Sequence, residues 1–321
     1  MLHAIAAVIL GFVLLLWGAD RFVTGAAALA RNLGVSPLII GLTIVGFGTS
    51  APEMLVSAVA SWQGNTGLAV GNAIGSNITN VALILGLTAL ITPLSVRSET
   101  LRREFPLLFV AMLGTLVLLL NGRLDRWNGI ILLTAMGVIL YWMFALAMRG
   151  RRDPMLAEYE AEIPAGMANA RAGVWLAVGL TLLLASSKML VWGAVSIAHT
   201  LGISDLVIGL TVVAIGTSLP ELAASVMSAV KGEHDIAIGN VLGSNIFNLL
   251  VVLGLPGVIR PGPIPPEALE RDFPVMIGLT VLLFAMAYGF RRPGHVTRLE
   301  GVILLAAFVG YEVLLYMTAR Q

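Results

Sequence analysis

The chain has 321 residues, of which 58% are hydrophobic and 12% charged, and its mean hydropathy is +0.94. Soluble domains of this length are far less apolar, so the composition indicates an integral membrane protein in a lipid bilayer. The net charge of +1, without basic runs between aromatic residues, argues against nucleic-acid binding, and the absence of cysteine excludes disulfides and thiolate chemistry.

Ten apolar runs, each long enough to cross a bilayer as a helix, follow one another along the chain. They fall at about 4–30, 36–61, 68–92, 105–121 and 127–148, and then at about 173–199, 204–230, 236–259, 273–290 and 299–318. The first run has neither a basic segment before it nor a clear cleavage site, so we expect a retained span rather than a signal peptide. The sequence predicts an all-α integral membrane protein with ten transmembrane helices.

A stretch of 47 residues, 41–87, recurs without a gap at 209–255, and 22 of the paired positions are identical. Further matches at the same offset of 168 extend the likeness over most of each half. We therefore expect a first five-helix repeat at 1–148, a cytoplasmic linker at 149–172 and a second repeat at 173–321. Because five is odd, the second repeat starts on the opposite side of the membrane and must be inverted relative to the first.

The distribution of Lys and Arg predicts the orientation. Twelve of them fall on the side that holds the linker and five on the other side: Arg31, Arg97, Arg102, Arg103, Arg149, Arg151, Arg152, Arg171, Lys231, Arg291, Arg292 and Arg298, against Arg123, Arg126, Arg260, Arg271 and Arg320. The richer side is expected to be cytoplasmic, which places the linker inside the cell and both termini outside it. We expect a multi-pass protein of the cell (inner) membrane.

Most of the repeated identities are polar residues or glycines. The first group comprises Gly48, Thr49, Ser50, Pro52 and Glu53, which match Gly216, Thr217, Ser218, Pro220 and Glu221. A charged side chain at the bilayer centre costs roughly 2.5–3.5 kcal/mol on insertion scales, so each glutamate needs a compensating partner. No Lys or Arg lies within either motif, and a bound cation is the simplest partner.

The prolines indicate broken helices. A proline removes one helical hydrogen bond and disturbs the carbonyl four residues earlier, here Gly48 and Gly216. Freed carbonyls, hydroxyl groups and two carboxylates form an all-oxygen environment, which hard cations such as Ca²⁺ and Na⁺ prefer. Inverted repeats bring such segments face to face near the midplane, where two negative charges would balance one Ca²⁺.

A second repeated group follows in the third and eighth predicted helices. Ser76 and Asn80 lie four residues apart, as do Ser244 and Asn248, so each pair shares a helical face and can supply neutral oxygens. Four further asparagines flank these faces and could instead bond to opened backbone: Asn72, Asn77, Asn240 and Asn245. Glycines 64, 71, 75 and 86 and their copies are better explained by close helix contacts.

Asp20 and Lys188 occupy equivalent positions, 168 residues apart, in the first and sixth predicted helices. Their opposite charges suggest an ion pair across the pseudo-twofold axis, as a latch or a structural tie.

At these residues the chain resembles the cation/Ca²⁺ antiporter superfamily, and within it the small prokaryotic members of the sodium/calcium exchanger family. The segments 48–53 and 216–221 are similar to the two signature repeats of that family, and 71–80 and 239–248 to their second halves. The resemblance implies a ten-helix exchanger in which Na⁺ entry drives Ca²⁺ extrusion by alternating access.

The resemblance also implies roles for individual residues. Ca²⁺ would be held by Glu53, Glu221, Thr49 and Thr217, with Asn80 and Asn248 at the border of the site. Flanking Na⁺ sites would be completed by Gly46, Ser50 and Ser76 and by Ala214, Ser218 and Ser244. Some relatives carry Asp at the position of Asn248. Its absence argues against K⁺ cotransport and leaves a proton as an alternative counter-ion, so the coupling is to Na⁺ or H⁺. The transported ions are substrates, and no cofactor is expected.

Two rival functions can be compared with this hypothesis. An intramembrane hydrolase lacks a base beside Ser50 or Ser218, since all four histidines fall near predicted helix ends, and the chain is therefore not expected to be an enzyme. A passive cation channel would usually gather a ring of residues about an axis normal to the membrane, whereas inverted copies in one chain favour alternating access. We expect a monomer.

Overall fold

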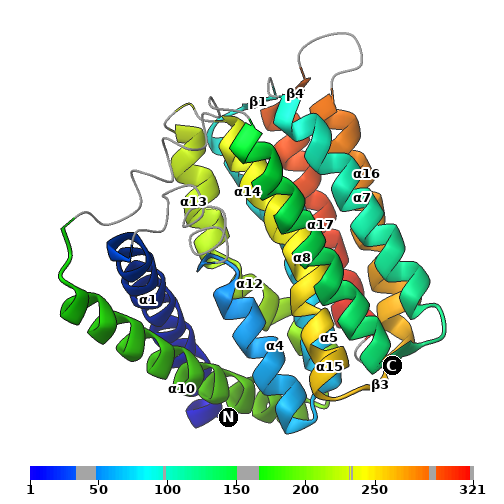
Figure 1. The fold of residues 1–321 in the computed structure, drawn as a ribbon. Helices are drawn as coiled ribbons and strands as arrows, with labels where there is room; N and C mark the ends of the chain where they lie inside the picture. Colours follow the sequence, from blue (N-terminus) through cyan, green and yellow to red (C-terminus); the bar gives the residue numbers. More distant parts are fainter. Residues whose placement is uncertain are drawn as a thin grey trace.

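The chain folds almost entirely into helices, because backbone N–H and C=O groups within a bilayer have no water and must pair with one another. The computed structural model describes residues 1–33, 48–96, 99–149, 166–230, 232, 234–288 and 294–318 (Figure 1). The elements of the first half are α1 (Leu2–Asn32), α4 (Ala51–Gln63), α5 (Thr66–Ile78), the π-helix η2 (Thr79–Ile84), α6 (Leu85–Ile91), β1 (Leu94–Val96), α7 (Glu99–Leu119), β2 (Arg123–Leu124) and α8 (Arg126–Arg149).

The second half repeats this order. Its elements are α10 (Asn169–Leu201), α11 (Asp205–Ile208), the π-helix η3 (Gly209–Val213), α12 (Ala214–Thr217), α13 (Leu219–Val230), α14 (His234–Phe247), the π-helix η4 (Asn248–Val252), α15 (Gly254–Ile259), β3 (Gly262–Pro263), the π-helix η5 (Ala268–Asp272), α16 (Phe273–Tyr288), β4 (Gly294–Val296) and α17 (Arg298–Thr318). The predicted linker lies largely outside the described residues.

The helices confirm the all-α membrane class, and the described part of each predicted apolar run falls on helical structure. By length and composition, five helices of the described chain can cross a membrane, or six when the bent pair Asp205–Thr217 and Leu219–Val230 counts as one span. This number covers the described residues only and is below the predicted ten: the second predicted run lies partly outside them, and α16 has only 16 residues.

Two short antiparallel ribbons join the halves. β1 pairs with β4, with Leu94 opposite Val296, and β2 pairs with β3, with Arg123 opposite Pro263. The ribbons lie at opposite ends of the bundle, with β1 and β4 at the top of Figure 1 and β3 beside the C-terminus at the bottom. We name these ends the β1–β4 face and the β2–β3 face. β1 and β3 occupy equivalent positions in the two repeats but opposite faces, as inversion requires.

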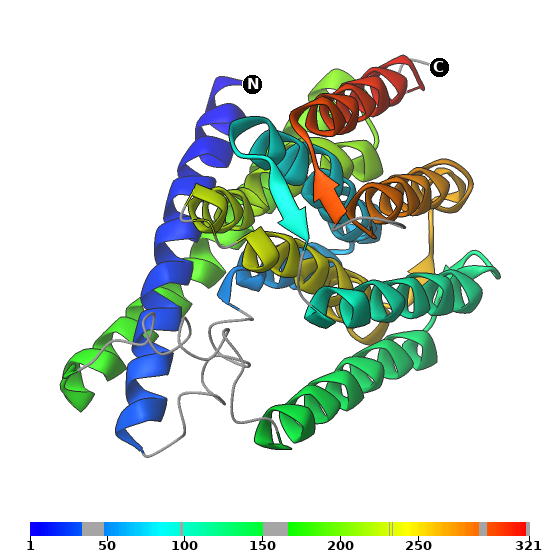
Figure 2. The same ribbon diagram turned by 90° about the horizontal axis from the view of Figure 1, so that it is seen from above.

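The two longest helices, α1 and α10, run side by side along one flank of the bundle (Figures 1 and 2). Glycines let their backbones approach closely: a Cβ atom at Gly179 would lie 2.3 Å from the Phe22 nitrogen. Arg21 stacks over the rings of Trp17 and Trp175 at the same contact.

The predicted pairing of Asp20 with Lys188 is not formed in the structure. Asp20 lies 3.5 Å from Arg21, its neighbour in the chain, and its side chain is 62% exposed. Lys188 is exposed as well. Arg21 is held by two aromatic rings and is the nearer cation, so the equivalence of positions 20 and 188 does not bring their charges together.

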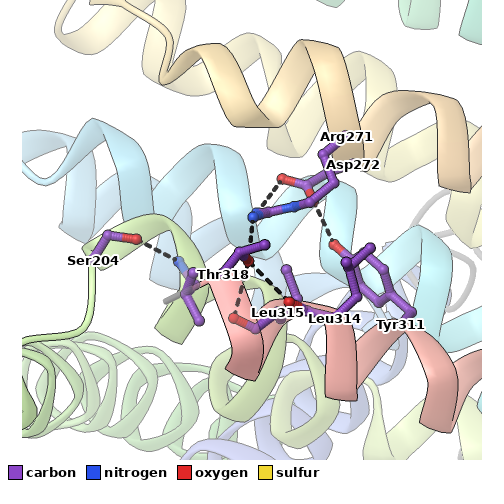
Figure 3. Close-up of polar contacts among 8 residues, drawn as sticks. Ser204, Arg271, Asp272, Tyr311, Leu314, Leu315 and Thr318 are labelled. Atoms are coloured by element: carbon purple, nitrogen blue, oxygen red, sulfur yellow. Dashed lines mark hydrogen bonds and ion pairs between the residues drawn. The ribbon is translucent and has the colours of Figure 1, made fainter. Parts of the chain in front are cut away.

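A buried ion pair ties the start of α16 to α17 (Figure 3). Arg271 contacts both oxygens of Asp272, from Nε at 2.7 Å and from Nη2 at 3.1 Å, and Tyr311 of α17 donates to Oδ1 of Asp272 at 2.9 Å. Arg271 also donates to Thr318 at 2.9 Å. Asp272 is fully buried, so one carboxylate satisfies groups from two elements.

Asp272→Ala should destabilise the protein by about 3 kcal/mol, because it leaves the Arg271 charge and the Tyr311 hydroxyl without their partner. The apparent melting temperature in detergent measures the effect. Asp125→Ala is the control: it removes the exposed pair with Arg123, 3.4 Å long, and should cost less than about 1 kcal/mol. Equal melting temperatures for the two variants would show that the cluster does not stabilise the fold.

Candidate cation-binding site

Glu53 and Glu221 each lie in the first turn of a helix that follows a break in the chain. Ser50 precedes α4, and the span of the second repeat bends by 44° at Ser218, between α12 and α13. Pro220 provides no N–H for the turn before it, which explains the break. The positive end of each following helix faces its own glutamate and favours a carboxylate there.

Each glutamate is bonded by the serine of the other repeat. Ser218 donates to Glu53 Oε1 at 3.2 Å, and Ser50 donates to Glu221 Oε1 at 3.2 Å. Ser244 donates to the same oxygen of Glu221 at 3.3 Å. The two broken segments therefore meet face to face, and the two carboxylates belong to one cluster.

A threonine of each repeat also lies near the glutamate of the other repeat. Thr217 lies near Glu53 and Thr49 lies near Glu221, each on the repeat opposite to its glutamate. Thr217 has one hydroxyl proton, and the acceptors within donating distance of it include the Val213 carbonyl at 3.1 Å and the Asn72 side-chain oxygen at 3.2 Å. Each acid is thus surrounded by oxygens of both repeats.

The cluster has no protein cation. Glu53 and Glu221 are fully buried, and the ion pairs found among the described residues include neither of them. The second carboxylate oxygen of each has no hydrogen-bond partner in the described part of the chain. Since a buried carboxylate without a partner is costly, this donor set fits a cation bound between the two acids.

Neutral polar atoms on α5, η2 and η4 are also buried without hydrogen-bond partners among the described residues. Buried atoms without a partner among the described residues include Ser76 Oγ, Asn80 Oδ1 and both amide atoms of Asn248. Asn80 donates to Asn245 across the repeats at 3.0 Å. Hard cations take such neutral oxygens together with carboxylates.

Hydrogen bonds join Glu53, Glu221, Ser50, Ser218 and Ser244 in the cluster, and the structure buries most of the other predicted residues. The fully or almost fully buried ones are Glu53, Glu221, Ser50, Ser218, Thr217, Ser76, Ser244, Asn80, Asn248 and Ala214, and Thr49 is half-buried. Gly46 lies outside the described residues. Among the described residues no three acidic or histidine side chains gather as in a resident metal centre.

Two kinds of feature were missed at the sequence level. Ser57 is buried and accepts a hydrogen bond from Asn72 at 3.0 Å, although only its identity with Ser225 pointed to a role. The π-helices η2 and η4, which begin at Thr79 and Asn248, had no sequence signal. The alternative role for the asparagines is confirmed at Asn72, which donates to the Glu53 carbonyl at 3.1 Å.

Glycines hold α5 tightly against the start of the seventh predicted span. A Cβ atom at Gly71 would lie 2.4 Å from the Leu206 oxygen, and one at Gly75 would lie 2.7 Å from the Leu210 backbone. Gly209 faces Gly71 directly. The predicted role in close helix contact is confirmed at Gly71, Gly75, Gly86 and Gly254, but at Gly232 and Gly243 no other part of the described chain lies within 4 Å of a Cβ position. The contact at Gly71 and Gly75 fixes α5 relative to α12 and its neighbour Ser218.

Comparison with known proteins assigns the chain to a protein family. It matches the family described as sodium/calcium exchanger protein over residues 3–145 and 171–317. The chain belongs to the sodium/calcium exchanger family. It is therefore a cation/Ca²⁺ antiporter by family and not an enzyme.

Relatives of this exchanger align over nearly their whole length. A putative antiporter, CaxA, from Alkalimonas amylolytica is 51% identical over 98% of this chain and 99% of its own. The inner membrane protein YrbG of Escherichia coli is 43% identical over 98% of both chains. A solved structure of the sodium-calcium exchanger NCX_Mj, soaked with Na⁺ and Sr²⁺, is 32% identical with a TM-score of 0.63 and covers 96% of this chain and 97% of that chain.

Gly71→Ala should destabilise this exchanger by about 1–3 kcal/mol, because the added methyl group meets backbone atoms rather than a flexible side chain. It should also lower Ca²⁺ binding by displacing α5. Gly114→Ala in α7 is the matched control, since within the described chain nothing lies within 4 Å of a Cβ atom there. The apparent melting temperature and Ca²⁺ titration measure both effects. A Gly71→Ala variant as stable as Gly114→Ala would refute the tight contact.

Proposed function

We propose that this exchanger extrudes Ca²⁺ in exchange for Na⁺ by alternating access, with Glu53 and Glu221 as the two charged ligands of Ca²⁺. The observation that carries the proposal is the buried pair of acids, each bonded by a serine of the opposite repeat and each with one oxygen that has no partner among the described residues. Two carboxylates balance one divalent ion, and the relatives named as sodium/calcium exchangers support Na⁺ as the counter-ion.

Around this pair, different neutral oxygens bind Ca²⁺ and Na⁺. Thr49 and Thr217 complete the Ca²⁺ site, and Asn80 and Asn248 border it. The Na⁺ ions occupy flanking positions, one beside Ser50, Ser76 and Gly46 and the other beside Ser218, Ser244 and Ala214. The serines that bond the glutamates are then shared, so that Na⁺ and Ca²⁺ compete for the same oxygens, as exchange requires.

Coupling to H⁺ is the second candidate, and Asn248 favours it. This position carries an amide whose two polar atoms have no partner among the described residues, so the cluster holds two acids rather than three. With only two charges to neutralise, two protons could replace Ca²⁺ in the return step. The proposed orientation, with both termini outside the cell, is the same for either counter-ion.

Transport into proteoliposomes tests the site and the counter-ion together. ⁴⁵Ca²⁺ uptake should follow an outward Na⁺ gradient, and a pH gradient alone should not drive it. Glu53→Gln and Glu221→Gln should each lower uptake by about tenfold or more, because one uncompensated charge of the divalent ion then remains in a buried site. Glu270→Gln, an exposed position of η5, is the control. Normal uptake by both site variants would exclude this site.

Ser76→Ala should separate the Na⁺ sites from the Ca²⁺ site. The Ser76 hydroxyl is buried without a partner in the described chain, so its loss should not weaken the fold. The Na⁺ concentration for half-maximal exchange should rise about threefold or more, as expected for one lost ligand, while Ca²⁺–Ca²⁺ exchange should change little. Ser187→Ala is the control, because that buried hydroxyl bonds only the Leu183 carbonyl at 2.7 Å. Equal losses in both exchange modes would contradict the division of sites.

A further inference from the structure

Asn72 and Asn240 are equivalent residues of the two repeats, but only one of them makes a full set of hydrogen bonds. Asn72 donates to the Glu53 carbonyl at 3.1 Å and to Ser57 at 3.0 Å, and its side-chain oxygen lies 3.2 Å from the Thr217 hydroxyl. All three groups of its amide that can bond are used. Two of these bonds reach residues of the proposed site.

Asn240 keeps only the part of this set that lies within its own repeat. It donates to Ser225 at 3.3 Å, the counterpart of the bond from Asn72 to Ser57. All the partners for the other two bonds are described, yet Asn240 forms no hydrogen bond with the Glu221 carbonyl or with Thr49. The difference therefore lies in the bonds that reach the site.

The residues with the complete set of bonds are also the more deeply buried ones. Asn72 and Thr217 are both 0% exposed, whereas Asn240 and Thr49 are half-buried. The sequence around the two asparagines is identical at the positions that matter: Gly-Asn and Gly-Ser-Asn recur in both copies. The groups that form the bonds are thus present in both repeats, but the structure brings the full set together only around Asn72.

The complete set belongs to the β2–β3 face. A cavity of 580 Å³ opens there and reaches Gly67 of α5 and Leu206 of α11. One turn further in, Gly71 packs against Leu206 and Gly209, and the bond between Asn72 and Thr217 follows at the next level. This packed layer separates the cavity from the glutamates. Asn240 lies in α14, which contacts β1 and belongs to the β1–β4 face.

In an inverted-repeat transporter, each repeat takes in one access state the conformation that its partner takes in the other. We propose that Asn72 and Asn240 are alternating positioning residues, each closing its own face of the exchanger by bonding to the threonine and glutamate of the site. In the state described here, Asn72 is bonded to Thr217 and the β2–β3 face is closed. In the opposite state, Asn240 bonds to Thr49 and to the Glu221 carbonyl, and the bonds of Asn72 to Thr217 and Glu53 are released.

The inference rests on the proposed function, since it assigns a role within alternating access. It links closure to occupancy, because Thr217 and the Glu53 backbone are parts of the site itself. An ion bound between Thr217 and Glu53 fixes the positions of both residues. It thereby fixes the Glu53 carbonyl, which accepts a hydrogen bond from Asn72, and the Thr217 hydroxyl, which donates one to it.

Hydrogen exchange of the full chain in nanodiscs, with Ca²⁺ and Na⁺ removed, tests the assignment. Asn72→Ala should raise amide exchange in 205–213 at the β2–β3 face and lower it in 234–240 at the β1–β4 face. Asn240→Ala should do the reverse. Loss of one or two buried hydrogen bonds should shift the ratio of the two states by about three- to tenfold. A residue with a merely structural role raises exchange at both faces.

Further variants keep the test decisive if an alanine variant fails to fold. Thr217→Val and Thr49→Val remove only the threonine hydroxyl and should reproduce the opposite shifts. Asn128→Ala is the matched control: this largely buried asparagine bonds the Leu118 and Arg123 carbonyls, far from the site along the chain, and should alter exchange only near them.

Hydrogen exchange of the wild-type protein distinguishes a failure of this inference from a failure of the proposed function. Adding Ca²⁺ or Na⁺ should change exchange in opposite directions at the two faces. If no ion changes exchange there, alternating access itself is wrong. If the ions do so but Asn72→Ala and Asn240→Ala shift both faces in the same direction, only the assignment of the asparagines is overturned.

Discussion

The burial of two carboxylates without a protein cation is the constraint on which the rest of the structure depends. Glu53 and Glu221 are both fully enclosed, and the ion pairs of the described chain leave them out. Helix N-termini, serine hydroxyls and threonines lower the cost but carry no full positive charge. A bound cation stabilises such a cluster. The unfavourable free energy of burying two carboxylates without a counter-charge therefore favours the binding of a transported ion.

Inversion is what allows both acids to come from one short motif. The hydrogen bonds of Ser50 and Ser218 bring the two broken segments together, and the ribbons β1–β4 and β2–β3 join the halves at opposite faces. Ser50 and Ser218 then reach the glutamate of the opposite repeat at the same distance, 3.2 Å. Under the proposed function, a movement of one half relative to the other would change a ligand set divided in this way, which would couple ion binding to conformation.

Sequence reasoning recovered the class of fold and most of the cluster, because membrane helices and intramembrane polar residues leave strong signals. Apolar runs marked the helices, and Pro52, Glu53 and their copies marked the breaks. Finer features left no such signal. A π-helix such as η2 depends on how a neighbouring helix packs, and the pairing of Arg21 with aromatic rings, which leaves Asp20 and Lys188 apart, depends on the rotation of α1 against α10. Neither is contained in periodicity or composition.

The asymmetry between Asn72 and Asn240 marks a deeper limit. The two asparagines share the same polar and glycine neighbours in the sequence, yet one is enclosed with every polar group bonded and the other is half-buried with one bond. Perfect symmetry would open or close both faces at once, which in a membrane gives either a leak or a sealed block. An exchanger must therefore break in structure the symmetry that its sequence keeps. The conserved pairing within each repeat, Asn72 with Ser57 and Asn240 with Ser225, preserves the means to restore the same bonds on the other side.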